Sequence, residues 1–498
     1  MALKQFPVIT RFLAVSLALL ITVEAVACGW GDDYETLRLA VFKSATPAME
    51  KFSPFYYSEH YFNEYEIKDT QDRQRNCAEW RDRLGSDVNQ DDIYKIQYST
   101  KPERFQTAYK EETLQETFEG NTFIKALLKP VNKPLLEYFV FAKEMEYEGN
   151  PQDSNWESWD DNAPRSYWDL PEDTTGVDYK TLLPIQKRLD ACKDTFLQQR
   201  YAFMLIRYGK RDNVKPLYNK YFANENVKSV AKAWATLFYA YATEDKAEQN
   251  YWLSKCFDLC NEKVIAVAQS YNREAQQQTL KLAKNDHERA VILTLDAMRN
   301  PGPVFEQIKK VNRLAPGSSY VDLLISREIN KFEDWLFAVQ MEGNSPDVYA
   351  DVWEGQDSYT VARKKNYLKD MAYLRRFRDY LIDVYGKTPA RVNHDFLASA
   401  IAHLSFMGDF TEEGYKYAKA ISENAPESVL VQKYTELALI ALKQKDISED
   451  STKQQLYIAL KNLDGLARKD EAYLKSLYTL LRLMAAAYNK KGHMATAS

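Results

Sequence analysis

The sequence predicts an all-α protein built from paired helices, and three observations favour that fold class. From Leu182 onward, apolar residues recur at intervals of three and four, as at Leu477, Leu480 and Met484, which is the period of an amphipathic helix. The 498 residues include only 16 Gly and 17 Pro, whereas β-sandwiches and barrels use many turn residues. The Asp-Gly pair at 464–465 lies between helical patterns, where a hairpin would need alternating ones.

Residues 1–27 are predicted to be an export signal. Lys4 and Arg11 supply positive charge before the apolar run 12–23, which is shorter than the roughly 20 residues of a membrane-spanning helix. Ala25 and Ala27 then place small residues at the −3 and −1 positions of a cleavage site. We therefore expect an exported chain in the periplasm or at the cell surface, beginning at Cys28.

Cys28 permits two interpretations. A small residue followed by Cys after an apolar run resembles the lipobox of bacterial lipoproteins, in which that Cys becomes the lipid-bearing N-terminus. Ala25 departs from the Leu that is usual in a lipobox. The resemblance makes Cys28 a lipidation candidate and implies an outer-membrane anchor. We expect the chain to have no attachment to a membrane other than this anchor. In the alternative, the chain is free and Cys28 pairs in a disulfide.

The region 28–146 is predicted to be helical and rich in aromatic residues. Short helices are expected around 77–84, 91–99 and 102–117, and a longer one over 122–147, kinked near Pro130 and Pro134. An aromatic cluster precedes these helices and consists of Phe52, Phe55, Tyr56, Tyr57, Tyr61, Phe62 and Tyr65.

Residues 147–180 form an acidic, tryptophan-rich stretch with three prolines and no periodicity, which predicts a linker or a long functional loop. Aromatic rings stack on sugar faces, and carboxylates accept hydrogen bonds from sugar hydroxyl groups. The candidate ligand-binding residues are therefore Trp156, Trp159, Asp160, Asp161 and Trp168. In the alternative interpretation, the acidic loop is solvated and its tryptophans pin it to the helical scaffold.

Residues 181–498 contain repeated helix–turn–helix segments. Examples are 201–221, 287–316, 394–426 and 481–497, in which a small residue often precedes the turn and an aromatic or a Pro follows it. These segments resemble the tetratricopeptide repeat (TPR), a helix pair of about 34 residues. The resemblance implies an irregular α-solenoid of TPR-like helix pairs. The segments depart from the family pattern at Arg299, in place of the turn Gly, and at Glu413, in place of a small residue.

The last repeat is predicted to be incomplete. The sequence stops at Ser498, just after Ala497 would begin the second helix of a pair. An unpaired first helix would leave its apolar face uncovered. We therefore expect either an atypical terminal pair or a chain that is part of a longer protein.

Composition and motifs limit the classes of function that the chain can have. A formal net charge of -5 lacks the basic excess of a nucleic-acid binder. The five His form no H-E-x-x-H motif, and the sequence has no Walker A motif and no G-x-S-x-G motif. No catalytic residue, metal ligand or cofactor is therefore predicted, and the chain is predicted not to be an enzyme.

The function predicted from these observations is that of an exported, non-enzymatic binding or scaffold protein with a protein partner. The chain also loosely resembles uncharacterised secreted bacterial proteins that share its Cys-Gly start and aromatic N-terminal region. One alternative is a surface glycan-binding protein, similar to the starch-binding lipoproteins that combine a lipid Cys with TPR helices. A second is a glycoside-active enzyme that uses two carboxylates.

Overall fold

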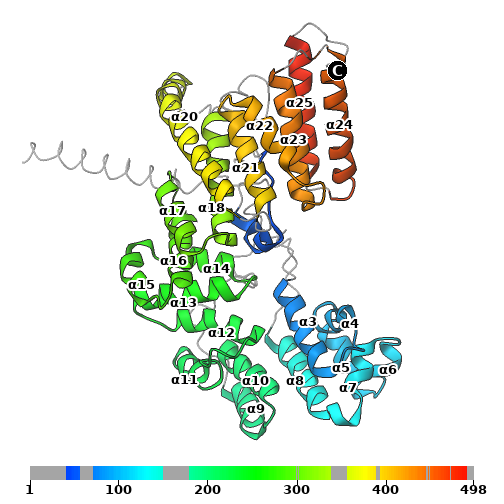
Figure 1. Ribbon diagram of the computed structural model, residues 1–498. Helices are drawn as coiled ribbons and strands as arrows, with labels where there is room; N and C mark the ends of the chain where they lie inside the picture. The colour runs from blue at the N-terminus through cyan, green and yellow to red at the C-terminus, as the bar shows by residue number, and fades with distance from the viewer. Residues whose placement is uncertain are drawn as a thin grey trace, which may run out of the picture. The chain divides into compact units, whose positions relative to one another are not determined.

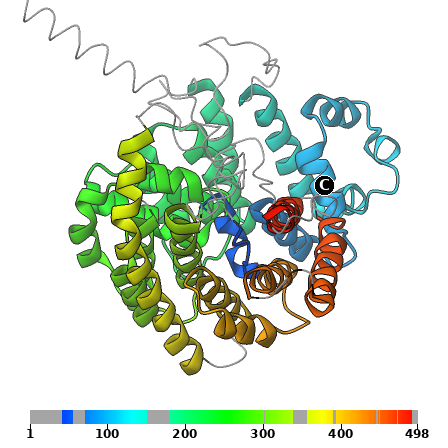
Figure 2. The ribbon, with the colours of Figure 1, turned by 90° about the horizontal axis from the view of Figure 1, so that it is seen from above.

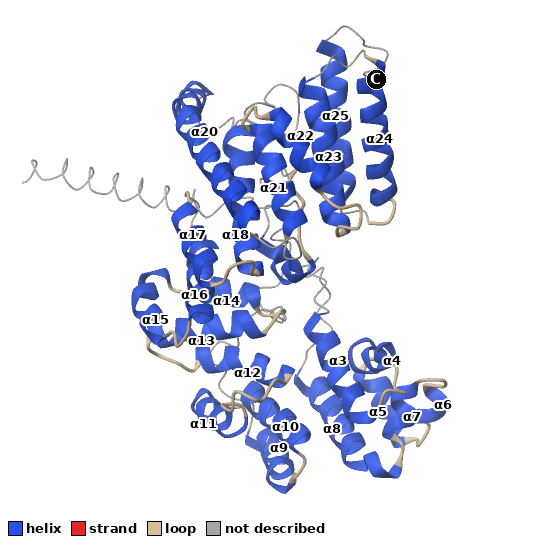
Figure 3. Ribbon diagram, viewed as in Figure 1, coloured by secondary structure: helices blue, strands red, loops and turns tan. Residues whose placement is uncertain are grey.

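The computed structural model confirms the all-α class: every regular element among the residues it describes is a helix (Figures 1 and 3). The described residues are 41–55, 71–149, 179–298, 300, 302–337, 356–388, 393–444, 447, 449–470 and 473–490.

The chain divides into two compact units. Unit 1 comprises residues 1–47, 53–67 and 325–498, and unit 2 comprises residues 48–52 and 68–324. The division runs through helix α18 (Ser319–Phe332) and through the 3₁₀ helix η1 (Pro47–Phe55). Both flanks of the predicted linker 147–180 belong to unit 2. Residues 147–149 of that stretch end a helix and 179–180 begin the next, while 150–178 lie outside the described part of the chain.

Unit 2 begins with short helices, and two of the helices that we expected are each divided in two. The predicted helix 102–117 is divided at Glu112, whose φ is 58°, in the left-handed region. The predicted kinked helix 122–147 is instead two helices with a 3₁₀ turn between them, because Pro130 begins a new helical turn. The elements are α3 (Gln71–Leu84), α4 (Gln90–Tyr94), η2 (Lys95–Ser99), α5 (Pro102–Lys110), α6 (Leu114–Thr117), α7 (Thr122–Leu127), η3 (Pro130–Asn132) and α8 (Lys133–Gly149).

The rest of unit 2 consists mainly of helices that pair with their neighbours. Two of the predicted helix–turn–helix segments are confirmed as helix pairs, α10 with α11 and α16 with α17. The elements are α9 (Tyr179–Ala191), α10 (Thr195–Tyr208), α11 (Arg211–Tyr221), α12 (Val230–Tyr241), α13 (Lys246–Leu259), α14 (Val264–Ser270), η4 (Arg273–Ala275), α15 (Gln276–Leu282), α16 (Asp286–Met298) and α17 (Phe305–Leu314).

Aromatic side chains fill the core of unit 2. Trp80 on α3 is 1% exposed and contacts the rings of Phe123, Phe139 and Phe196 edge to face. Phe52 of η1 is fully buried and its ring lies 5.4 Å from that of Phe257. Part of the aromatic surplus in the sequence is therefore packing between helices.

Unit 1 repeats one arrangement of helices. Helix α21 pairs with α22, and α23 pairs with α24; in addition α21 contacts α23, and α23 contacts α25. The predicted segment 394–426 is thus confirmed as a helix pair. The elements after α18 are η5 (Glu333–Phe337), α20 (Gln356–Lys387), α21 (His394–Met407), α22 (Thr411–Ala420), α23 (Glu427–Gln444), α24 (Asp450–Ala467) and α25 (Leu474–Lys490).

Gly414 permits the close approach of α22 to α21. A Cβ atom at this position would lie 3.3 Å from the carbonyl oxygen of Ala402, 3.3 Å from the Cβ of Ser405 and 3.1 Å from the Cδ1 of Ile440. Glu413, which we noted as a departure from the repeat pattern, is half-exposed and pairs with Arg378 at 2.9 Å. The small residue at this helix contact is therefore Gly414.

We expect Gly414→Ala to lower the free energy of unfolding by about 1–2 kcal/mol, because the added methyl group meets the backbone of α21. Gly465→Ala is the matched control, since nothing lies within 4 Å of its added Cβ and Gly465 lies inside helix α24. That substitution should raise stability by about 0.4–1 kcal/mol. Urea denaturation of the three chains measures both effects, and equal changes at the two positions would contradict the packing argument.

Candidate functional site

The site residues predicted from the sequence cannot be placed. Cys28, Trp156, Trp159, Asp160, Asp161 and Trp168 all lie outside the described residues. The lipidation and glycan-binding candidates therefore remain predictions.

The other four cysteines are free thiols. Cys77, Cys256 and Cys260 are buried, and burial raises the pKa of Cys77 to about 12, so its thiol stays protonated at neutral pH. Within the described residues, no group of three or more His, Cys, Asp or Glu side chains is placed to hold a metal ion.

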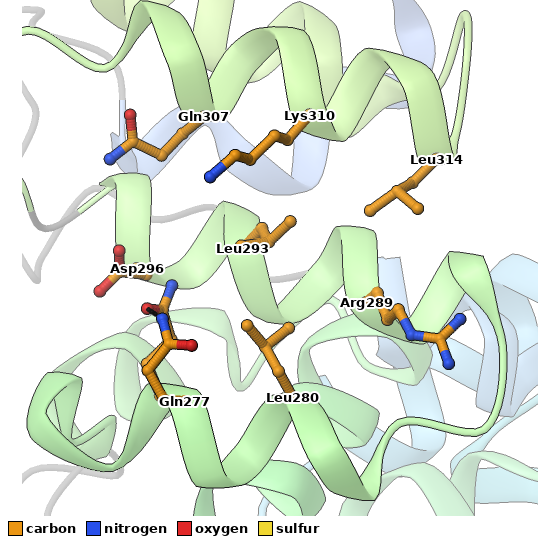
Figure 4. Close-up of a pocket in the computed structure, with 9 residues that line it drawn as sticks. Gln277, Leu280, Arg289, Leu293, Asp296, Gln307, Lys310 and Leu314 are labelled. Carbon is orange, nitrogen blue, oxygen red and sulfur yellow. Dashed lines mark hydrogen bonds between the residues drawn. The ribbon is translucent and has the colours of Figure 1, made fainter.

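Unit 2 contains a pocket of about 410 Å³ between α15, α16 and α17 (Figure 4). Leucines from all three helices line it, together with Gln277, Gln307 and Lys310. Asp296 also lines the pocket and forms an ion pair with Arg273 at 3.2 Å. The lining therefore offers apolar contact, amide groups and charged groups, including those of Arg289 and Lys310, but no aromatic ring on which a sugar would stack.

A more specific arrangement lies in unit 1, where residues 41–46 pass between helices without forming one. We call these residues the N-terminal segment; in Figures 1 and 2 they are dark blue and lie against α21 and α23. Val41, Phe42 and Ser44 are buried. Side chains from distant parts of the sequence bind this segment or hold the side chains that bind it, and we call them the segment site: Glu333, Ser399, His403, Ser428, Gln432 and Glu436.

The segment site binds mainly the backbone of the segment. The amide groups of Val41 and Phe42 both donate to Oε1 of Glu333, at 2.8 Å each. The amide of Lys43 donates to Oε1 of Gln432 at 2.7 Å. The hydroxyl of Ser428 donates to the carbonyl oxygen of Ala45 at 2.9 Å. Backbone groups that lack helical partners are thus satisfied by side chains.

The acceptors themselves are joined through His403. Its Nδ1 lies 2.6 Å from Oε1 of Glu436, which also accepts a hydrogen bond from Nε2 of Gln432. Its Nε2 lies 3.0 Å from Oε1 of Glu333, within ion-pair distance but away from the direction of a straight hydrogen bond. The segment and these four side chains therefore form a closed ring of polar contacts: Glu333, His403, Glu436 and Gln432.

His403 carries the positive charge of this ring. Burial opposes that charge, but Glu436 and Glu333 outweigh burial and raise the pKa of His403 to about 10. The imidazole is fully buried, and both ring nitrogens face carboxylates. This geometry suits His403 for holding two buried carboxylates in position, and the carboxylates in turn bind the segment.

Local structure brings these residues together. Glu333 begins the π-helical turn η5, which follows α18 directly. His403 lies in α21, a helix with twelve buried residues in succession from Phe396 to Met407. Gln432 and Glu436 are four residues apart on α23 and therefore share a face. The sequence did not predict this site, because its only local signal is a His within an apolar helix, and that signal does not identify the partners of the His.

The side chain of Phe42 packs against two aromatic rings of α21. The ring centroid of Phe42 lies 5.6 Å from that of His403 and 6.2 Å from that of Phe396. Two residues further along, the hydroxyl groups of Ser44 and Ser399 lie 2.7 Å apart, a distance that leaves room only for a small side chain. The arrangement therefore binds the backbone of the segment and contacts its side chains closely at two positions.

Comparisons with protein-family models, with curated proteins and with solved structures found no match to this chain. Within the described residues, none of the helices combines the length and apolar character needed to cross a membrane.

Proposed function

We propose that the chain is an exported, non-enzymatic binding protein that holds another protein on the surface of a TPR-like α-solenoid. The contacts of unit 1 support the solenoid: α21, α23 and α25 contact one another in sequence, and α22 and α24 each pair with the helix before them. Stacked helix pairs of this kind expose extended surfaces to partners. Export and an anchor at Cys28 are part of the proposal.

The observation that carries this proposal is the segment site. Side chains of unit 1 bind the backbone of the segment at four residues, through the amide N–H groups of Val41, Phe42 and Lys43 and the carbonyl oxygen of Ala45. Recognition of non-helical backbone by helical side chains is the chemistry that a peptide-binding scaffold needs. His403 and its two carboxylates are enclosed with the segment, so the same residues do not favour catalysis on a diffusing substrate.

A cross-linked pull-down tests the proposal. The chain beginning at Cys28 serves as bait against envelope extract of the source cells, and mass spectrometry identifies what is captured. We expect one protein partner in stoichiometric amount, with cross-links to helices of the repeat region. The same chain unfolded in urea is the control, since a folded surface should be required. Recovery of polysaccharide without a protein would overturn the proposal and favour the glycan-binding alternative.

A further inference from the structure

We infer that the N-terminal segment is an intramolecular ligand of its site, and that a partner protein binds there by inserting a segment of the same chemistry. This inference rests on the proposed function and names the site and the kind of partner. The partner segment carries two apolar residues, then a lysine, then two small residues, as in Val41 to Ala45.

The backbone contacts support exchange because they do not depend on which chain supplies the segment. Glu333 accepts two successive amide N–H groups, Gln432 accepts the next one, and Ser428 donates to a carbonyl oxygen. Any polypeptide with the same backbone conformation presents these groups with the same spacing. The partners in the site belong to η5 and α23, elements that start 291 residues or more after Phe42.

The side-chain contacts define which segment fits. Phe42 is 5% exposed and lies against the rings of Phe396 and His403, so an aromatic residue at this position gains both apolar burial and contact with a charged imidazole. The hydroxyl of Ser44 meets that of Ser399. Lys43 is only partly buried, and its main contribution on the segment side is the amide N–H group that donates to Gln432.

An empty site would be unfavourable in free energy, which explains why the segment occupies it. Without the segment, the buried carboxylate of Glu333 loses two charge-assisted hydrogen bonds, and Gln432 loses a third. The segment is also covalently attached, so it binds intramolecularly and a separate peptide must compete with it. A separate peptide should therefore bind the wild-type chain weakly, and bind well only when the attached segment is weakened.

The test uses a fluorescent peptide with the sequence of residues 41–48 and the full-length chain. Phe42→Ala in the chain removes the main side-chain anchor of the attached segment. We expect this variant to bind the peptide about a hundredfold more tightly than the wild type does, measured by fluorescence anisotropy. A peptide in which Asp replaces the residue equivalent to Phe42 should bind neither chain.

Two further variants locate the binding. Adding Gln432→Ala to Phe42→Ala should abolish the gain, since the amide of Lys43 then has no acceptor. Adding Tyr434→Phe instead should preserve it, because that hydroxyl contacts Glu423, away from the segment. Lys43→Pro, which deletes the donor to Gln432, is a second way to weaken the attached segment.

A folded Phe42→Ala or Lys43→Pro chain that binds the peptide no better than the wild type would overturn the inference. Failure of both variants to fold, judged by circular dichroism, would also overturn it, because the segment would then be an integral part of the core. A partner recovered in the pull-down together with a negative peptide test would leave the proposed function standing and place the partner elsewhere.

Discussion

Replacing His403 with leucine should lower the free energy of unfolding by about 3–5 kcal/mol, the usual cost of removing one partner from a buried ion pair. Leucine fills much of the same volume but leaves Glu333 and Glu436 without the charge between them. Both carboxylates are buried, so water cannot replace the lost contact. Urea denaturation, followed by circular dichroism, measures the loss.

His287→Ala is the matched control for this prediction. His287 also lies beside a carboxylate, with its Nε2 2.9 Å from Oδ2 of Asp258, but half of its side chain is exposed. Such contacts typically contribute less than about 1 kcal/mol. A His403→Leu chain as stable as the His287→Ala chain would show that the ring of polar contacts does not stabilise unit 1.

The stability of the wild-type chain should also fall as the pH rises from about 6.5 to 10. In the folded state the pKa of His403 is raised to about 10 from its ordinary value of 6.5, so the unfolded chain loses this proton first. The stabilisation is fully present below pH 6.5 and is lost as the pH approaches 10, by up to about 1.4 kcal/mol per pH unit. His403→Leu should lack this slope, and a parallel slope in both chains would contradict the assignment.

Asp72→Ala should have an effect of similar size in unit 2, about 3–5 kcal/mol. One carboxylate oxygen of this buried residue, Oδ2, accepts from Sγ of Cys260 at 2.9 Å, from the amide of Asn261 at 2.8 Å and from the amide of Glu262 at 2.7 Å. Its other oxygen accepts from Arg75 at 2.8 Å. The substitution would leave three donors at the end of α13 without their acceptor.

Hydrogen exchange measured by mass spectrometry tests this prediction, because α3 and the turn after α13 should lose protection together. Asp72→Asn should lie between the wild type and Asp72→Ala, since an amide oxygen still accepts but carries no charge. The control is Asp82→Ala on the same helix, whose side chain is 74% exposed. Loss of protection confined to α3 would contradict the link between the two elements.

The fold class and several helix pairs could be predicted from the sequence because their signals are local. Apolar spacing and a short turn are enough to indicate α16 with α17 and α21 with α22. The prediction of one helix over 122–147 was wrong for a local reason too. A proline is compatible with a kink inside a helix or with the first turn of a new helix, and at Pro130 the structure shows a new helical turn.

The segment site could not be predicted because its contacts are not local. The amide of Lys43 and Oε1 of Gln432 are separated by 389 positions, and no pattern near either residue indicates the other. The tryptophans at 156, 159 and 168 were predicted as ligand-binding residues because they cluster in the sequence. Clustering along the chain and clustering in space are different properties, and only the first can be read from one sequence.

The wide separation between the N-terminal segment and its binding residues has a consequence for synthesis of the chain. At roughly 5–20 residues per second, Gln432 leaves the ribosome ~20–80 s after Lys43. Residues 68–324 form most of unit 2 and are complete before any of the segment's binding residues has been made. During this interval Val41 and Phe42 have no binding partners, while residues 68–324 can already fold. The first described residues of the protein are among the last to reach their final places.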